Sequence, residues 1–169
     1  RQSKGAERAT GREGIMTLVL HGHPLSSFVQ KTTMALYEND MPFELKFLDL
    51  GNDDARAAFR ALWPIGKMPV LHDDARDHTV PEASIIIEYL AQHYPGRMEL
   101  VPKDADLARQ VRFRDRFFDL YVAVPMQKIV TDRIRPVGKH DPHGVEDARV
   151  LLKTALDMID EEIKGRSWA

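Results

Sequence analysis

The chain has 169 residues and a formal net charge of −2, and its 43% hydrophobic and 30% charged side chains are typical of a folded globular protein. This charge provides no broad attraction for nucleic acid or an anionic membrane, and no apolar run approaches the roughly 20 residues that span a bilayer. The absence of cysteine excludes disulfides, cysteine-ligated metals and any mechanism that uses a thiolate of the protein itself, including that of a thiol–disulfide reductase.

Residues 1–14, RQSKGAERATGREG, are polar and charged. They offer too little apolar surface to fold, and no apolar core follows them as it would in a secretory signal. We therefore expect a disordered leader.

The next part of the chain alternates short apolar strands with amphipathic helices. Aliphatic and β-branched runs predict the strands, and apolar residues spaced three or four apart predict the helices. The predicted elements are a strand at 17–20, a helix starting at Ser26 or Ser27, a strand at 43–50, a helix capped by Asp53 or Asp54 and ending at Leu62, strands at 69–72 and 78–80, and a helix ending before Pro95. The order β-α-β-α-β-β-α predicts an α/β domain over 15–98, with a parallel crossover pair and an antiparallel hairpin packed between helices.

After a linker near Val101-Pro102-Lys103 the pattern becomes purely helical. Apolar residues at helical spacing predict one long helix bent near Pro125, and Asp141 followed by Pro142 predicts the start of another. The apolar stripe of that second helix consists of Leu152, Leu156, Ile159 and Ile163. We expect an all-helical domain over 103–169. Because two helices cannot close a core, we expect it to be incomplete at the C-terminus and the isolated chain to self-associate.

Three segments combine unusual residues at turn positions. They are Pro24-Leu25-Ser26-Ser27-Phe28, Trp63-Pro64-Ile65-Gly66-Lys67-Met68-Pro69-Val70-Leu71 and Pro81-Glu82-Ala83-Ser84-Ile85-Ile86-Ile87-Glu88-Tyr89-Leu90. In this order, and followed by a helical unit, they resemble the glutathione S-transferase family, in its bacterial-type form with a serine at the thiol position. The resemblance implies a thioredoxin-like domain that binds glutathione and an all-helical domain that builds the site for an electrophile.

Ser26 matches the hydroxyl that holds the glutathione thiolate in this family. A free thiol has a pKa of about 8.5, so a hydroxyl hydrogen bond and the positive end of a helix would favour the thiolate at neutral pH. The alternatives are that Ser26 only caps the helix, or that its neighbour Ser27 carries the role.

Met68-Pro69 resembles the cis-proline element of the family, which would turn the Met68 backbone toward the cysteinyl part of glutathione. The alternative is a trans proline that opens an edge strand. Lys67 could bind a carboxylate of glutathione, although most surface lysines have no specific role.

Glu82 matches the acid that takes the γ-glutamyl ammonium, while its alternative role is to complement the helix dipole. The family normally has Ser after this Glu, and here Ala83 leaves only its backbone N–H for the γ-glutamyl carboxylate. Ser84, one position further on, is an uncertain substitute because it points about 100° around the helix. Weakened glutathione binding is therefore an open alternative.

Other polar groups have simpler interpretations. His21-Gly22-His23 lacks a third metal ligand, so we predict no metal site. Arg109, Arg112 and Arg116 share one helix face, which we interpret as solvated, and residues 139–143 read as a polar loop.

The sequence thus predicts a glutathione S-transferase that stabilises the glutathione thiolate and transfers it to a small electrophile. Such a detoxification enzyme would be cytoplasmic and a homodimer when full length. It would use glutathione as co-substrate, with no further cofactor and no nucleic-acid or membrane partner. The alternative is a non-catalytic binding or interaction protein of the same fold with a weakened thiol site, which Ala83 favours.

Overall fold

The computed structural model describes residues 17–166, so the expected leader at 1–14 lies outside the described residues. The chain divides into two compact units, the first ending at Met98 and the second starting at Glu99. Among the described residues, no helix is both long and apolar enough to cross a membrane.

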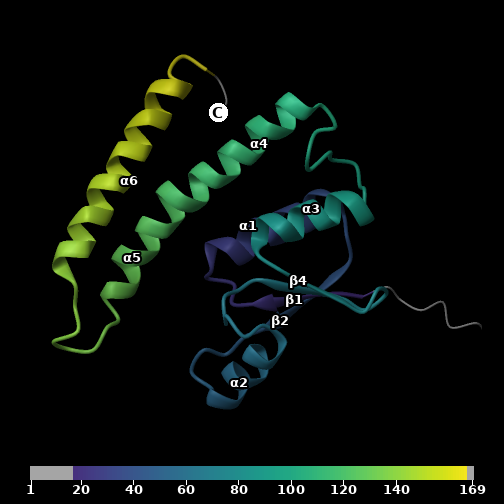
Figure 1. The fold of residues 1–169 in the computed structure, drawn as a ribbon, viewed down its shortest axis with the longest axis horizontal. Helices are drawn as coiled ribbons and strands as arrows, with labels where there is room; N and C mark the ends of the chain where they lie inside the picture. Colours follow the sequence, from purple (N-terminus) through teal and green to yellow (C-terminus); the bar gives the residue numbers. More distant parts are fainter. Residues whose placement is uncertain (1–16, 167–169) are drawn as a thin grey trace, which may run out of the picture. The chain divides into compact units, whose positions relative to one another are not determined.

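The first unit is a four-stranded mixed sheet with helices on both faces (Figure 1). Its elements are β1 (Leu18–Gly22), α1 (Ser27–Glu38), β2 (Phe43–Phe47), α2 (Asp53–Leu62), β3 (Val70–Asp73), β4 (His78–Pro81) and α3 (Ala83–His93). The strand order is β2-β1-β3-β4, with β1 parallel to β2 and antiparallel to β3, and with β3 and β4 antiparallel. Helices α1 and α3 cover one face and α2 lies on the other. The predicted order and the thioredoxin-like fold are confirmed.

The core of this unit lies between the two central strands and the pair α1 and α3. Leu20 of β1 and Leu71 of β3 are paired across the sheet, and both are fully buried. Leu36 of α1 and the α3 residues Ile86 and Leu90 are also fully buried. A smaller cluster of Leu48, Phe59 and Val70 packs under α2.

Strands β1, β3 and β4 differ from their predicted bounds by one or two residues, and two further differences have a clear physical cause. Strand β2 ends at Phe47 rather than Leu50, and it is an edge strand, so Leu45 and Phe47 remain 38% and 60% exposed. Alternation predicts a strand but not how many neighbours cover it. The N-cap of α2 is Asn52, whose side chain accepts a hydrogen bond from the Ala55 amide at 3.0 Å, and not Asp53 or Asp54.

The second unit is helical. It consists of α4 (Ala105–Phe117), a π-helical segment η1 (Phe118–Ala123), α5 (Val124–Asp132) and α6 (Pro142–Ile163). The predicted bend near Pro125 takes the form of η1, which ends just before that proline. Pro125 lacks an N–H and crowds the carbonyl four residues earlier, which explains why the preceding turn widens.

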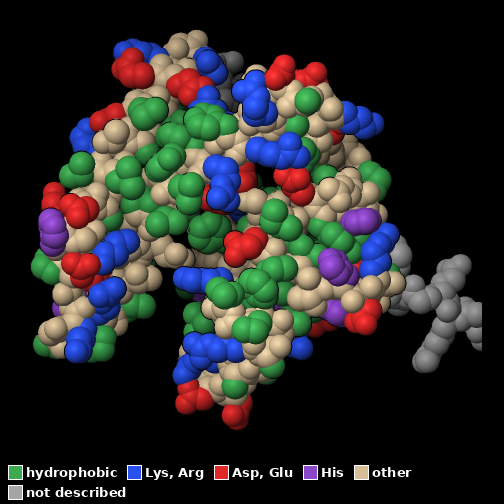
Figure 2. All heavy atoms as spheres, in the orientation of Figure 1, with side chains coloured by type: hydrophobic (Ala, Val, Ile, Leu, Met, Phe, Trp, Pro, Cys, Tyr) green, Lys and Arg blue, Asp and Glu red, His purple; other side chains and the backbone are tan. Residues whose placement is uncertain are grey.

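The buried face of α6 matches the predicted stripe only in part. Ala148 and Ala155 are buried, and Leu152, Ile159 and Ile163 of the predicted stripe are half-buried, but Leu156 is 46% exposed. Small alanines let α6 approach α5 closely, and Leu156 is rotated off that line. Figure 2 shows hydrophobic side chains gathered on the surface of this helical unit, and self-association stays a prediction.

Candidate functional site

Strand register brings the three unusual segments to one end of the sheet. His21 of β1 pairs with Val70 of β3, and Val70 pairs in turn with Pro81 of β4. The segments that follow β1, precede β3 and follow β4 therefore lie at the same end of the sheet. Met68-Pro69 directly precede Val70, Glu82-Ala83 directly follow Pro81, and Ser26 comes after the turn that follows β1, so the fold gathers the predicted site residues in one region.

Ser26 occupies the N-cap position of α1 with an extended backbone (φ −77°, ψ 122°). Its amide donates to the His23 carbonyl at 2.9 Å, and its own carbonyl accepts from the Gln30 amide at 2.9 Å. The side chain makes no capping hydrogen bond, and within residues 17–166 no partner is found for its hydroxyl. The alternative interpretation, in which the Ser26 hydroxyl only caps α1, is therefore wrong for this structure. The hydroxyl remains available to a ligand.

The Met68–Pro69 peptide bond is cis, as predicted, and Pro69 is fully buried. The Met68 side chain lies beside the first segment, because the His23 amide donates to its sulfur at 3.3 Å. This contact joins the loop before α1 to the loop before β3. Lys67 is exposed next to these residues, and its role stays a prediction.

Glu82 has a positive φ of 71°, a conformation that glycine favours and that costs a residue with a Cβ about 1–3 kcal/mol. Its carbonyl accepts from the Ile86 amide at 2.8 Å and so begins α3. Its exposed side chain does not cap that helix, and within residues 17–166 the carboxylate forms no ion pair or hydrogen bond. A contribution to local stability does not explain why Glu82 occupies this strained backbone position, because its carboxylate makes no contact that would stabilise the fold.

Ala83, the first residue of α3, is only 4% exposed, so its methyl group is packed where the family pattern expects a hydroxyl. Ser84 follows, and its hydroxyl accepts a hydrogen bond from the Lys31 ammonium of α1 at 3.1 Å. This contact of Lys31 was not predicted from the sequence. The available signal was that Lys31 is the only basic residue of α1 and lies one turn after Ser27.

These groups suit a ligand with a thiol and an amino-acid-like end. The Ser26 hydroxyl lies at the positive end of α1, where an anion is favoured. At the start of α3, the exposed Glu82 carboxylate suits an ammonium, and the Ala83 amide suits a carboxylate.

A second polar cluster in this unit, around Asp73, is buried and fully hydrogen-bonded within the protein. The fully buried Asp73 carboxylate accepts hydrogen bonds from the hydroxyls of Tyr89 and Tyr94, each at 2.6 Å, and from Arg76 at 3.2 Å. Its other oxygen accepts from the Ala75 amide at 3.0 Å. Burial raises the pKa of Asp73, but the hydrogen bonds from Tyr89, Tyr94 and Arg76 outweigh it and hold that pKa below its usual value. Burial and the bond to Asp73 raise the pKa of Tyr94 to about 12.

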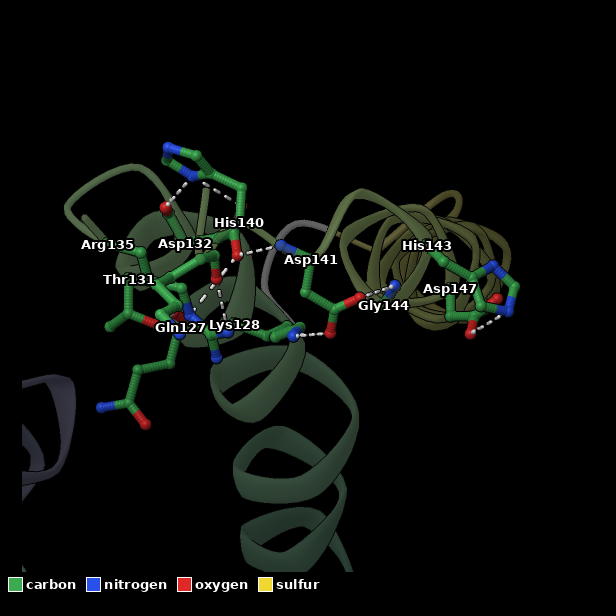
Figure 3. Close-up of polar contacts among 11 residues, drawn as sticks. Gln127, Lys128, Thr131, Asp132, Arg135, His140, Asp141, His143, Gly144 and Asp147 are labelled. Atoms are coloured by element: carbon green, nitrogen blue, oxygen red, sulfur yellow. Dashed lines mark hydrogen bonds and ion pairs between the residues drawn. The ribbon is translucent and has the colours of Figure 1, made fainter. Parts of the chain in front are cut away.

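The second unit also has a hydrogen-bonded polar cluster, which lies at the turn between α5 and α6 (Figure 3). Asp132 is buried and accepts from the Asp141 amide at 2.9 Å, with Arg135 at 3.5 Å and His140 at 3.4 Å. Asp141 caps α6 by accepting from the Gly144 amide at 2.9 Å. Residues 139–143, interpreted as a plain polar loop, therefore include a structured helix connection.

The remaining polar groups of the described residues do not gather into a candidate metal site. Within residues 17–166, no three His, Asp or Glu side chains gather in a way that could hold a metal ion. His21 is half-buried, and burial followed by the charge of Lys46 lowers its pKa. A cavity of about 340 Å³ lies beside it, between α2 and the ends of β1 and β2, and is lined mostly by apolar side chains.

Comparison with known proteins agrees with this geometry. Residues 20–98 match the family model described as the glutathione S-transferase N-terminal domain. The chain is 32% identical over 116 residues to the glutathione S-transferase-like protein LUC7 of a Fusarium species, a match that covers 69% of this chain and 52% of that protein. The chain thus spans about half the length of this curated relative.

Solved structures show the same fold. A glutathione S-transferase from Methylobacillus flagellatus KT with glutathione bound superposes with a TM-score of 0.79 at 22% identity, covering 89% of this chain and 72% of that one. A glutathione transferase family member from Pseudomonas fluorescens Pf-5, also with bound glutathione, gives a TM-score of 0.71 at 25% identity, covering 86% of this chain and 71% of that one.

Proposed function

The chain belongs to the glutathione S-transferase family, and from this premise we propose that it binds glutathione at the end of the sheet where Ser26, Met68-Pro69 and Glu82 lie. We propose further that it stabilises the glutathione thiolate and transfers it to a small electrophile. The observation that carries this proposal is the Ser26 hydroxyl, which lies at the start of α1 and is not used to cap it.

The chemical step requires a thiolate at neutral pH. The Ser26 hydroxyl donates a hydrogen bond to the sulfur, and the N-terminus of α1 adds a positive potential, so both favour the ionised form. The thiolate then attacks the electrophilic carbon and forms the new carbon–sulfur bond, while the leaving group departs with its electron pair. Only interactions that are stronger in the transition state of this attack than in the bound ground state raise the rate of the chemical step.

The rest of glutathione is held by the other segments. The Met68 backbone N–H and C=O pair with the cysteinyl residue as an added strand would. The Glu82 carboxylate binds the γ-glutamyl ammonium, and the Ala83 N–H at the start of α3 binds the γ-glutamyl carboxylate. Lys67 binds the glycine carboxylate.

The remaining features of the proposal rest on the family resemblance. They are a small electrophilic co-substrate, a role in detoxification, a homodimeric full-length protein and a cytoplasmic location. Glutathione is a co-substrate in this scheme, which includes no resident cofactor.

One observation favours a second candidate, a non-catalytic binding or interaction protein of the same fold with a weakened thiol site. Ala83 lacks the hydroxyl expected at the γ-glutamyl carboxylate, and a missing hydrogen bond costs about 0.5–1.5 kcal/mol, or up to about 3 kcal/mol with a charged partner.

Calorimetric titration of glutathione into the full-length protein, paired with a conjugation assay on an aryl halide, separates the two candidates. Binding together with conjugation supports the enzyme. Binding without conjugation of any of several electrophiles contradicts the transfer step, and no binding at millimolar glutathione supports the non-catalytic protein.

A further inference from the structure

We propose that edge strand β2 is an interaction surface for a second copy of this chain. The β2 strands of the two copies pair antiparallel about a two-fold axis at Leu45, and the two four-stranded sheets become one continuous sheet. The contact does not depend on the proposed function, and it uses no residue of the proposed glutathione site.

The outer edge of β2 is open (Figure 1). In the strand order β2-β1-β3-β4, this strand has β1 on one side and, within residues 17–166, no strand on the other. The backbone N–H and C=O groups on the open side form a row that can template another strand. Proteins commonly protect such an edge with a proline or a bulge, but the strand Phe43–Phe47 contains neither, and each of its residues is in register with β1. The backbone of β2 is therefore able to pair with another strand.

One face of β2 carries apolar side chains that the helices leave partly uncovered. Leu45 is in parallel register with the core residue Leu20, so alternate residues from Phe43 to Phe47 lie on the face of the sheet that α1 and α3 cover. Leu45 and Phe47 are nevertheless 38% and 60% exposed. A second copy placed beside this edge buries part of their surface, and burial of apolar surface favours association.

The other face of β2 carries two opposite charges. Glu44 and Lys46 are both exposed, and within residues 17–166 neither side chain forms an ion pair or a hydrogen bond. A lysine on an edge strand usually deters pairing between copies of a protein. Here, antiparallel pairing about Leu45 places each Glu44 directly opposite the Lys46 of the other copy. The same register places Phe43 opposite Phe47, so the sequence of β2 is complementary to itself.

Other registers lack this complementarity. Parallel pairing in register brings Glu44 opposite Glu44 and Lys46 opposite Lys46. Antiparallel pairing centred on either charged residue places that residue opposite its own copy. Because like charges directly opposite each other destabilise a pair of strands, the charges favour the register centred on Leu45 and favour a second copy of this chain as the partner.

The proposed interface is small. Its five residues a side are well below the roughly 20–30 residues a side of a standard stable interface. We therefore expect a weak dimer whose population rises with protein concentration, and a covalent cross-link is the suitable way to detect it.

Cysteine cross-linking tests the register, because the chain contains no cysteine of its own. In the proposed dimer, Leu45→Cys places two thiols directly opposite each other, with Cβ atoms about 5 Å apart and within reach of a disulfide. The Phe47→Cys thiols are four residues out of register, about 13 Å apart. We expect mild oxidation to link Leu45→Cys into a dimer at least 10-fold faster than Phe47→Cys, with each rate normalised to the reactivity of that thiol toward a small disulfide reagent. Equal or reversed rates overturn the proposal.

Charge reversal tests the complementarity. In the Leu45→Cys background, Glu44→Lys and Lys46→Glu each bring like charges together, and we expect each to slow cross-linking about 10-fold. An equimolar mixture of the two variants regains both opposite-charge pairs and should form the mixed disulfide at close to the original rate, a recovery that misfolding cannot produce. Glu99→Lys and Lys103→Glu make the same changes of net charge at exposed positions outside the strand and should leave the rate unchanged. Unchanged rates in the β2 variants, equal slowing in the controls, or no recovery in the mixture overturns the proposal.

Discussion

Two sets of polar groups in the first unit differ in how they are used. At the buried end of β3, the Asp73 carboxylate has both oxygens occupied by Tyr89, Tyr94, Arg76 and the Ala75 amide. At the opposite end of the sheet, the Ser26 hydroxyl makes no capping bond, and the Glu82 side chain projects from a strained backbone without capping α3.

The difference separates stability from function. A buried polar group must be hydrogen-bonded, because leaving it unpaired costs about 1–3 kcal/mol, so the Asp73 cluster has an evident stabilising role. Strain and uncommitted polar groups contribute nothing to folding, and such features concentrate at ligand sites. We therefore expect substitutions at one end of the sheet to change stability and those at the other to change binding or rate.

Asp73→Ala should have the largest effect. Removing the carboxylate leaves the buried Tyr89 hydroxyl and the Ala75 amide without their partner, and we expect the free energy of unfolding to fall by about 2–4 kcal/mol. Urea unfolding followed by circular dichroism measures this. Asp74→Ala, at a neighbouring exposed carboxylate, is the control and should cost less than about 1 kcal/mol. Equal losses would show that the buried cluster is not special.

The same carboxylate makes the fold acid-sensitive. Folding lowers the pKa of Asp73 below its usual value of 3.8, so its stabilising contribution is present above that value and is lost as the pH falls through the lower folded pKa. We expect the unfolding free energy to drop below about pH 4, and less steeply in Asp73→Asn, which has no proton to gain. Parallel pH profiles for the two proteins would contradict this.

Ser26→Ala should have the next largest effect, at the other end of the sheet. We expect the rate of aryl halide conjugation to fall about 100-fold, the size seen when one donor to a developing charge is removed. Glutathione affinity and stability should change little, because the hydroxyl is proposed to act mainly on the thiolate and does not cap α1. Ser27→Ala is the matched control. If Ser27→Ala loses as much activity, or more, the assignment to Ser26 is wrong.

Glu82→Gly tests whether the strained acid serves binding. Glycine accepts the positive φ, so we expect stability to change by less than about 1 kcal/mol, while glutathione affinity falls about 10-fold through loss of the charge pair with the ammonium. Calorimetry and thermal unfolding of the same sample measure both. Unchanged affinity would remove Glu82 from the proposed site.

Ala83→Ser should have the smallest effect and the opposite sign. A restored hydroxyl at the start of α3 should tighten glutathione binding about 2- to 10-fold, from roughly 0.5–1.5 kcal/mol. Unchanged affinity in the titration would indicate that another group already fills this role.

Local sequence signals predicted most of the architecture. Periodicity and turn residues gave the right order of strands and helices, and the Asp141-Pro142 pair marked the true start of α6, because a cap acts within one helical turn. The cis bond before Pro69 was also predicted, and there the identity of two adjacent residues carries the signal. Errors arose where a neighbouring element decides the outcome, as at the exposed edge strand β2 and at Leu156 of α6, which is exposed although the predicted stripe includes it.

The candidate site shows the same division. The sequence by itself determined which residue types stand at the ends of β1, β3 and β4, and therefore what chemistry is available there. Only the tertiary structure decided that the Ser26 hydroxyl does not cap α1, that the backbone of Glu82 is strained, and that Lys31 contacts Ser84. The physical reason is that hydrogen-bond partners can come from segments far apart in the chain, and a local sequence pattern does not indicate which distant group will be the partner.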